Sequence, residues 1–384
     1  MQPVYIIGTG QTAVAEHWER TAGDLAREAF TAALGNIAPE RVQALYVANA
    51  LGSALQVQGH MGAAIATAIG LPGIEASTID AAGASGGVAL RQAYLAVASG
   101  AYDLVAVVGV EKVTDVLDGR LEAGLALAGD ADWEGVHGAT LTAQWAMLMR
   151  RYMHQYSYDA VDFAPFPVNA HANGAANPKA LYRFATSVEK VRAAGLVADP
   201  LSLLDSSTVA DGAAVVLVAS AGMARELGAP LIRIAGSAVA TDTLALHQRP
   251  DPLWLGAAAR SAASALSDAG LSTGDVQAIE LTDPHGIAAT LGLEACGFAE
   301  RGAGVQLARE GGIGVGGATP LATGGGCKAR GDTVGANGVF QIVELTRQLR
   351  GEAGKAQVAN ARVALGQCLG GIGATAATHI LVAE

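Results

Sequence analysis

The chain has 384 residues, of which 51% are hydrophobic, and carries a formal net charge of −11. This length suffices for two core-bearing halves or one large duplicated domain, and the apolar content excludes a disordered chain. The acidic balance argues against a nucleic acid or an anionic membrane surface as the main partner. The three cysteines show no CxxC or paired spacing, so we expect no disulfide framework and no metal site. With no signal-peptide pattern and no long apolar run, a cytoplasmic protein is expected.

Strands and helices alternate through the first third of the chain. Strands are predicted at residues 4–7, 42–48, 76–79 and 103–110, with helices at 21–34, at 61–69 and from the turn after residue 79 to about 99. Several of these strands are apolar throughout, which is typical of a mostly parallel sheet covered on both faces. Thr21 stands where an N-cap is expected.

The pattern changes between residues 114 and 206, where polar loops and short helices predict a domain inserted over the sheet. Strand character then returns at 213–219 and 231–235, and a second alternating series follows. Its strands are predicted at 278–281, 362–365 and 378–382, and its helices at 254–269, 287–296 and 335–349. We therefore expect an N-terminal half (1–113 with 207–240), the inserted loop domain (114–206) and a similar C-terminal half (241–384).

A glycine-rich turn lies at the centre of the first half. Residues 80–87 (DAAGASGG) lead from the strand at 76–79 into a helix. A side chain at such a turn lies over unpaired N–H groups and the positive end of the helix dipole, which favours a thiolate nucleophile. The same composition also occurs in structural turns of many α/β proteins. Gly83, in the middle of the turn, has no side chain to react.

Several segments resemble thiolases and occur in the family's order. The turn resembles the family's Cys-Ala-Ser-Gly nucleophile turn, and the other matches are GVEKVT (109–114), HANGAANPKA (171–180), DGAA (211–214) and GGCKARG (325–331). The chain is identified as a member of the thiolase superfamily, nearest to the sterol-carrier and archaeal type. The resemblance implies an α/β fold of five αβαβα layers built from two similar halves, a loop domain that receives coenzyme A, and a homodimer or homotetramer.

The family's catalytic residues are replaced. Gly83 stands at the vacated nucleophile position, and TDPH (282–285) stands where the family has His-Asp-Ala/Cys-Phe. GDTVG (331–335) replaces Gly-His-Pro-x-Gly, and QCLGG (367–371) stands at the last active-site loop. Loss of a covalent nucleophile alone lowers turnover on the order of 10⁶-fold. A normal Claisen thiolase cycle is therefore disfavoured.

Four residues remain as catalytic candidates, each with a structural alternative. Asp332 stands at a catalytic His position and can accept a proton, or it caps the following helix. Asp283 and His285 can form an acid/base pair near neutral pH, or serve as an N-cap and an exposed loop histidine. Cys368 is a reactive thiol in the active-site loop, or a buried small apolar residue.

Ligand-binding candidates lie in the loop domain. Arg150 and Arg151 suit the phosphates of coenzyme A, although basic residues ending a helix also complement its dipole. His171 and Asn173 would position the loop domain, or be structural. No covalently bound cofactor is expected, and coenzyme A or an acyl-CoA would be the substrate or ligand.

Three functions are left open. In the first, the protein makes or breaks a carbon–carbon bond of an acyl-CoA thioester without an acyl-cysteine, which resembles steroid side-chain lyases that work beside a small OB-fold partner. In the second, it is a non-catalytic acyl-CoA-binding or scaffolding subunit. In the third, it is a residual acyltransferase that uses Cys368.

Overall fold

The computed structural model describes residues 2–116, 119–228 and 231–384. The strands of the main sheet are β1 (Val4–Gln11), β2 (Ala44–Ala48), β3 (Glu75–Ile79), β4 (Leu104–Glu111), β7 (Gly212–Ser220), β8 (Ile232–Thr241), β9 (Ala278–Leu281), β10 (Val363–Gly370) and β11 (Thr375–Ala383). They form one nine-stranded sheet in the order β3-β2-β4-β7-β1-β8-β11-β10-β9. A second, two-stranded sheet pairs β5 (Leu196–Ala198) with β6 (Leu201–Ser202).

The prediction of a mostly parallel sheet was wrong, because the main sheet is mixed. Among the described strands, β2–β3, β2–β4 and β9–β10 are parallel, and the other neighbouring pairs are antiparallel. β4 and β7 are antiparallel neighbours, and both are buried at every position. Their continuous apolar sequences therefore report burial on both faces and carry no information on strand direction.

The strand order repeats in the two halves. From the outer edge inward, the first half reads β3-β2-β4-β7-β1. The second half reads β9-β10-β11-β8, and Leu321 forms a parallel bridge to Ile279 of β9 where the first half has β3. The halves join where Tyr5 and Ile6 of β1 pair with Arg233 and Ile232 of β8. The expected similarity of the halves is present in strand order and direction, whereas their exact boundaries stay a prediction.

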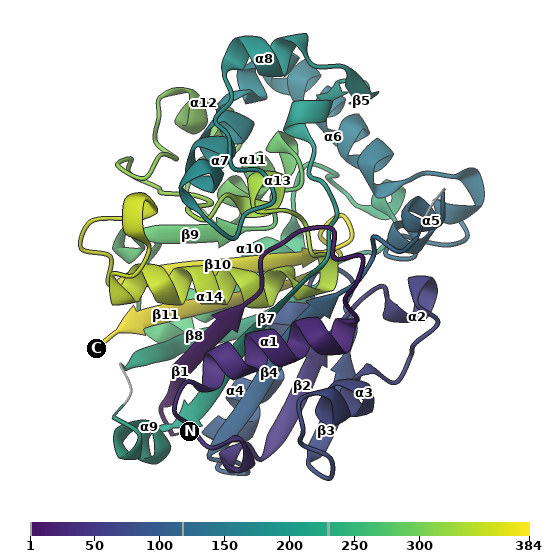
Figure 1. Ribbon diagram of the computed structural model, residues 1–384. Coiled ribbons are helices and arrows are strands. Elements are labelled where there is room, and N and C mark those ends of the chain that lie inside the picture. The colour runs from purple at the N-terminus through teal and green to yellow at the C-terminus, as the bar shows by residue number, and fades with distance from the viewer. Residues whose placement is uncertain (1, 117–118, 229–230) are drawn as a thin grey trace.

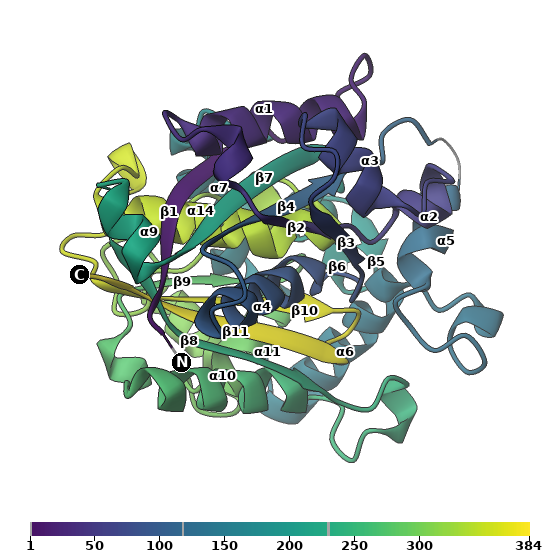
Figure 2. The same ribbon diagram turned by 90° about the horizontal axis from the view of Figure 1, so that it is seen from below.

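Helices cover this sheet in layers. Those of the two halves are α1 (Ala22–Leu34), α2 (Gly52–Leu55), α3 (Met61–Ala68), α4 (Ser85–Ala98), α9 (Ala221–Glu226), α10 (Gly256–Ala269), α11 (Gly286–Ala295), α12 (Gly304–Arg309), α13 (Gly326–Ala329) and α14 (Asn337–Arg350). One core packs α1 and α3 on the first half, and another packs α10 and α11 on the second. A central core joins α4 and α14 to strands of both halves. The two halves of the sheet lie on opposite sides of α4 and α14, which confirms the expected five layers. In Figure 2 these layers follow one another as α1 with α3, the strands of the first half, α4 with α14, the strands of the second half, and α10 with α11.

The two central helices meet at their N-termini through glycines. A Cβ atom on Gly86 of α4 would lie 2.7 Å from the backbone nitrogen of Val339 in α14. A Cβ on Gly338 would lie 2.5 Å from the backbone nitrogen of Gly87. Only hydrogen atoms fit into such contacts. The turn before α4 and the turn before α14 therefore lie at the same end of the central layer.

The inserted segment lies over one end of the sheet, at the top of Figure 1. Its helices are α5 (Arg120–Ala126), α6 (Leu141–Tyr156), α7 (Pro165–Ala176) and α8 (Val188–Ala193). α7 packs against α13 of the second half. Within the described residues, no helix combines the length and the apolar character that crossing a bilayer requires.

Candidate active site

The turn between β3 and α4 is held by the first residue of the helix. Ser85 Oγ accepts the N–H of Ala81 at 2.9 Å and donates to the carbonyl oxygen of Ala82 at 2.6 Å. Ala82 has a φ of 51°, which is uncommon for a residue with a side chain and is typical of functional turns. The turn thus places residue 83 directly before the positive end of a fourteen-residue helix.

The end of β10 closes over Gly83. A Cβ atom on Gly83 would lie 2.5 Å from the carbonyl oxygen of Leu369. Leu369 is fixed in turn, because its N–H donates to Thr282 Oγ1 at 3.0 Å. The backbone therefore fills the space that a nucleophilic side chain at position 83 would need.

Cys368 lies in a strand and is buried. The predicted strand at 362–365 is longer than expected, because β10 continues its pairing with β11 to Gly370, and Cys368 lies opposite Ala377. Its Sγ lies 3.5 Å from the carbonyl oxygen of Ala84, and burial raises the pKa of the thiol to about 12. The thiol is therefore protonated at neutral pH. Burial likewise raises the pKa of Cys296 to about 12 and that of Cys327 well above its ordinary value.

Asp332 is the one half-buried residue among the four catalytic candidates. Its Oδ2 accepts the hydroxyl of Ser207 at 3.0 Å. Its Oδ1 accepts the N–H of Val334 at 2.9 Å and Nδ2 of Asn337 at 2.6 Å. These donors hold the carboxylate in one orientation at the turn before α14. The bond to Val334 closes a local turn, but the predicted capping role is wrong, because the N-cap of the 3-10 helix at Val334–Ala336 is Thr333 and that of α14 is Ala336. The half-buried position of Asp332 is of the kind expected for a base.

Asp283 and His285 face different partners. Asp283 Oδ1 accepts the N–H of Cys327 at 2.7 Å, and its Oδ2 lies 3.4 Å from Lys328 Nζ. Burial, reinforced by the charge of Lys328, lowers the pKa of His285 to about 3, so its imidazole is neutral. In the described part of the chain no hydrogen bond joins Asp283 to His285. The structure thus brings these residues near one ammonium group without making them an acid/base pair.

His285 lies next to a buried carboxyl group that the sequence did not single out. Asp205 Oδ1 accepts the N–H of Gly286 at 2.9 Å, at the start of α11. Burial raises the pKa of Asp205 to about 7, against the opposing charge of Lys328. A residue before β7 therefore caps a helix of the second half.

Two of the family-like segments meet at Asp211. This buried carboxylate accepts the N–H groups of Val113 and Thr114 at 2.6 and 3.0 Å and pairs with Lys112 Nζ at 3.0 Å. Burial opposes ionisation, but hydrogen bonds from the Thr114 side chain and the backbone dominate and lower its pKa. The segments at 109–114 and 211–214 are therefore joined by one buried charge cluster, which is a structural role.

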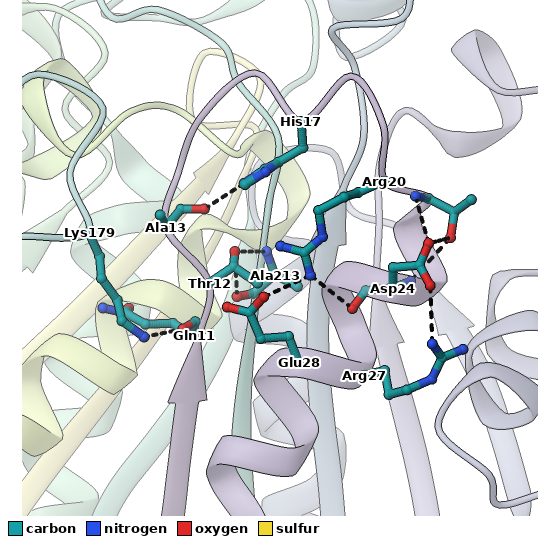
Figure 3. Close-up of polar contacts among 11 residues, drawn as sticks. Gln11, Thr12, Ala13, His17, Arg20, Asp24, Arg27, Glu28, Lys179 and Ala213 are labelled. Carbon is teal, nitrogen blue, oxygen red and sulfur yellow. Dashed lines mark hydrogen bonds and ion pairs between the residues drawn. The ribbon is translucent and has the colours of Figure 1, made fainter.

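The third family-like segment is anchored to the start of the chain. Lys179 Nζ donates to the carbonyl oxygen of Gln11, at the end of β1 (Figure 3). One residue further on, Thr12 Oγ1 accepts the N–H of Ala213 at 3.0 Å. Thr21 forms a capping box with Asp24, which confirms the predicted N-cap of α1. The loop after β1 thus connects the inserted domain with β7.

The ligand-binding candidates have separate surroundings. Arg150 pairs with Asp199 at the surface, whereas Arg151 lines a pocket. His171 is buried, its ring stacks on Tyr182 with centroids 5.9 Å apart, and burial lowers its pKa. Asn173 Nδ2 donates to the carbonyl oxygen of Ala322 at 3.0 Å and so ties α7 to the second half. Of the four, Arg151 is the one free to meet a ligand in that pocket.

This pocket has a volume of about 540 Å³ and lies between α6, the loop before it and the loop before α10. It is lined by Trp133, Glu134, Ala139, Gln144, Met147, Leu148, Arg151, Leu246, His247, Arg249 and Pro252. Arg249 Nη1 donates to the carbonyl oxygen of Ile372 at 2.6 Å, in the turn that follows β10. The pocket wall is thus attached to the hairpin that closes over Gly83.

The fold and the arrangement of these turns define an α/β protein of two similar halves, and comparison with known proteins places it in a family. The family profiles described as "Thiolase, N-terminal domain" and "Thiolase C-terminal domain-like" match residues 4–222 and 238–383. The chain belongs to the thiolase family.

Individual relatives differ in the activities for which they are named. An acetyl-CoA acetyltransferase of Methanothermobacter thermautotrophicus is 39% identical over 99% of both chains. The benzoylsuccinyl-CoA thiolase subunit BbsB of Thauera aromatica is 32% identical over 96% of this chain and 94% of its own. Among solved structures, the Ltp2-ChsH2(DUF35) aldolase matches 100% of this chain and 98% of its own, with a TM-score of 0.86 and 26% identity.

Sequence reasoning missed the residues that support the candidates. Ser207 bonds Asp332 and lies four residues before the segment at 211–214, so no motif pointed to it. Thr282 bonds the N–H of Leu369 and belongs to the segment at 282–285, where no role was expected for it. The pocket residues Trp133, Met147 and His247 come from irregular loops and one helix face, and no spacing connects them.

Proposed function

We propose that this chain binds acyl-CoA thioesters and makes or breaks a carbon–carbon bond by acid/base chemistry, without an acyl-cysteine intermediate. One observation carries the proposal: the Leu369 carbonyl fills the space beside Gly83, while Asp332 is only half-buried. The contact between Gly86 and Gly338 sets the turns that carry these two residues at the same end of the central helices. The three buried, protonated thiols leave no candidate for acyl transfer.

Asp332 would act as a base in the cleavage direction. It takes the proton from the β-hydroxyl of a β-hydroxyacyl-CoA, and the O–H electron pair forms the new carbonyl as the Cα–Cβ bond breaks. The electrons of that bond become the enolate of the thioester, and the proton returns from Asp332 to Cα. The products are an aldehyde or ketone and a shortened acyl-CoA, and no other reactant is required. The positive end of α4 favours the negative charge of the enolate.

The named relatives support the thioester and the reaction class from two sides. The similarity to an acetyl-CoA acetyltransferase supports a coenzyme A thioester as the ligand. The similarity to an aldolase supports cleavage of a carbon–carbon bond as the reaction. The name of the aldolase also includes a second component, ChsH2(DUF35), which supports the expectation of a small partner protein. A homodimer or homotetramer remains part of the same proposal.

The test is turnover of a panel of β-hydroxyacyl-CoA esters by Asp332→Asn, followed as release of carbonyl product. We expect a loss on the order of 10²- to 10⁴-fold, because a positioned general base contributes that much. Asp132→Asn, at an exposed carboxylate, is the matched control and should keep parental turnover.

Unchanged turnover in Asp332→Asn would refute the role of Asp332. Calorimetric titration with acyl-CoA runs in parallel, because a parent that binds without turnover would instead be a non-catalytic acyl-CoA-binding subunit. Failure to bind any coenzyme A ester would refute the proposed function as a whole.

A further inference from the structure

The 540 Å³ pocket takes no part in the proton transfers described above, and its size decides what it can hold. Ligand pockets have volumes of about 300–1,000 Å³, so this one falls in the range of a whole small-molecule group. A water molecule takes about 30 Å³, so the three heavy atoms of an acetyl group need roughly 90 Å³. An acetyl group would leave most of the pocket empty or filled with water.

Two polar side chains of the pocket, Glu134 and Gln144, are bonded within the protein. The two oxygens of Glu134 accept the N–H groups of Leu246 at 2.7 Å and Asp130 at 2.9 Å. Gln144 Nε2 donates to the carbonyl oxygen of Ala139 at 3.2 Å. The bonded groups of these two side chains therefore need no hydrogen bond from a ligand. Most of the pocket surface that a ligand would contact is apolar.

The rim carries apolar side chains that face water. Trp133 is 60% exposed and Met147 is 56% exposed, although both line the pocket. The ring of Trp133 lies against that of His247, with centroids 5.1 Å apart and planes tilted by 49°. A large apolar group in the pocket would remove these side chains from water. Removing apolar surface from water is favourable, so the rim favours an apolar ligand.

One buried donor in the wall lacks a partner among the residues that the structure describes. Arg249 donates through Nε to Thr243 and through Nη1 to Ile372, but Nη2 has no hydrogen bond although the side chain is buried. An oxygen acceptor on the buried end of a ligand would complete this guanidinium. The pocket thus combines a largely apolar wall with one buried unsatisfied donor, and the exposed guanidinium of Arg151 also lines it.

The pocket lies within reach of the candidate site. Ile372, held by Arg249, is three residues beyond Leu369, a span of at most about 11 Å along the chain. On the same hairpin turn, a Cβ on Gly371 would lie 2.5 Å from the carbonyl oxygen of Ala128, near the start of the loop that carries Trp133. A group attached to a reacting thioester can span this distance.

We infer that this pocket binds the acyl group of the thioester, and that this group is a bulky, largely apolar one, ring-bearing or branched, with an oxygen acceptor. The inference rests on the proposed function and adds the substrate class. It separates the chain from an enzyme that is specific for acetyl groups. The coenzyme A portion then lies outside the pocket.

The test is calorimetric titration of the full chain with four ligands: free coenzyme A, acetyl-CoA, cyclohexylacetyl-CoA and 2-naphthylacetyl-CoA. We expect the two bulky esters to bind at least tenfold more tightly than acetyl-CoA. Met147→Trp fills the pocket from its rim and should remove that preference, while the affinities for coenzyme A and acetyl-CoA change less than twofold. Leu203→Trp enlarges an exposed apolar residue outside the pocket and should keep the preference.

Each other outcome has a distinct meaning. Equal affinity of the parent for acetyl and bulky esters overturns the inference and leaves the proposed function intact. An equal loss of affinity for free coenzyme A in Met147→Trp also overturns it, because the pocket would then hold the nucleotide. If none of the four ligands binds the parent, the proposed function itself fails.

Discussion

The sulfur of Cys368 fills the space beside Gly87 in which a side chain would begin, since a Cβ on Gly87 would lie 2.5 Å from Sγ. The thiol is therefore a packing group between a strand of the second half and a helix of the first. Ala84 and Ala377 complete this small buried cluster.

Thiol labelling should reflect this position. We expect none of the three cysteines to react with iodoacetamide at pH 7.5 on the timescale of a free thiol, because all are buried and burial raises their pKa values. Unfolding in urea should make all three reactive, as mass spectrometry of the labelled chain can show. Fast, selective alkylation of native Cys368 would instead support the residual acyltransferase.

Adding a side chain at Gly83 should destabilise the protein without restoring thiolase chemistry. Gly83→Ala and Gly83→Cys place a Cβ 2.5 Å from the Leu369 carbonyl oxygen, and overpacking of this kind costs about 1–3 kcal/mol. Urea unfolding measures this loss. Gly195→Ala is the control, because no atom of the described chain beyond the neighbouring residues lies within 4 Å of its added Cβ. An acyl-cysteine adduct on Gly83→Cys after incubation with acetyl-CoA would contradict the expectation.

Replacement of Glu111 should change how stability depends on pH. Burial, with a smaller contribution from Asp80, raises the pKa of Glu111 from 4.5 to about 8. The folded chain then keeps a proton that the unfolded chain releases, so this group lowers stability by about 1.4 kcal/mol per pH unit as pH rises from about 4.5 to 8. Glu111→Gln removes this loss and should gain stability relative to the parent across that window.

Urea titrations at pH 5, 6.5 and 8 test this expectation. The difference between Glu111→Gln and the parent should grow with pH, while Glu40→Gln, at an exposed position, should show no such trend. A difference that stays constant with pH would show that Glu111 is ionised in the folded chain.

Asp211→Asn should be strongly destabilising. It leaves the buried ammonium of Lys112 without its buried partner, and breaking one side of such a pair costs about 3–5 kcal/mol. Because the folded pKa of Asp211 is lowered, its contribution is present above about pH 4 and is lost on further acidification. The variant should therefore lose less stability than the parent between pH 5 and pH 2. Lys112→Met combined with Asp211→Asn should recover part of the loss.

Local patterns predicted most of the elements. The apolar run at 103–110 contains β4, the capping residue Thr21 precedes α1, and the glycine-rich stretch at 80–87 is the turn and the first residues of α4. These features depend on neighbours in the chain, which the sequence displays directly. Strand direction could not be read in the same way, because burial on both faces gives β4 and β7 the same composition whichever way their neighbours run.

The state of the candidate site depended on contacts between distant residues. Nothing near Gly83 shows that the Leu369 carbonyl lies against it, because 286 positions separate the two. The sequence likewise placed Cys368 in a loop, since the glycines after it favour a turn, whereas pairing with β11 carries β10 past it. Replaced motifs thus marked the position of the site, and tertiary packing decided which of its side chains are accessible.

The central core draws apolar side chains from both halves and encloses α4 and α14 between them. Neither half alone would have an opposite wall for its own central helix. An excised half would expose that surface to water and should aggregate, and the intact chain should melt in a single cooperative transition despite its repeated architecture.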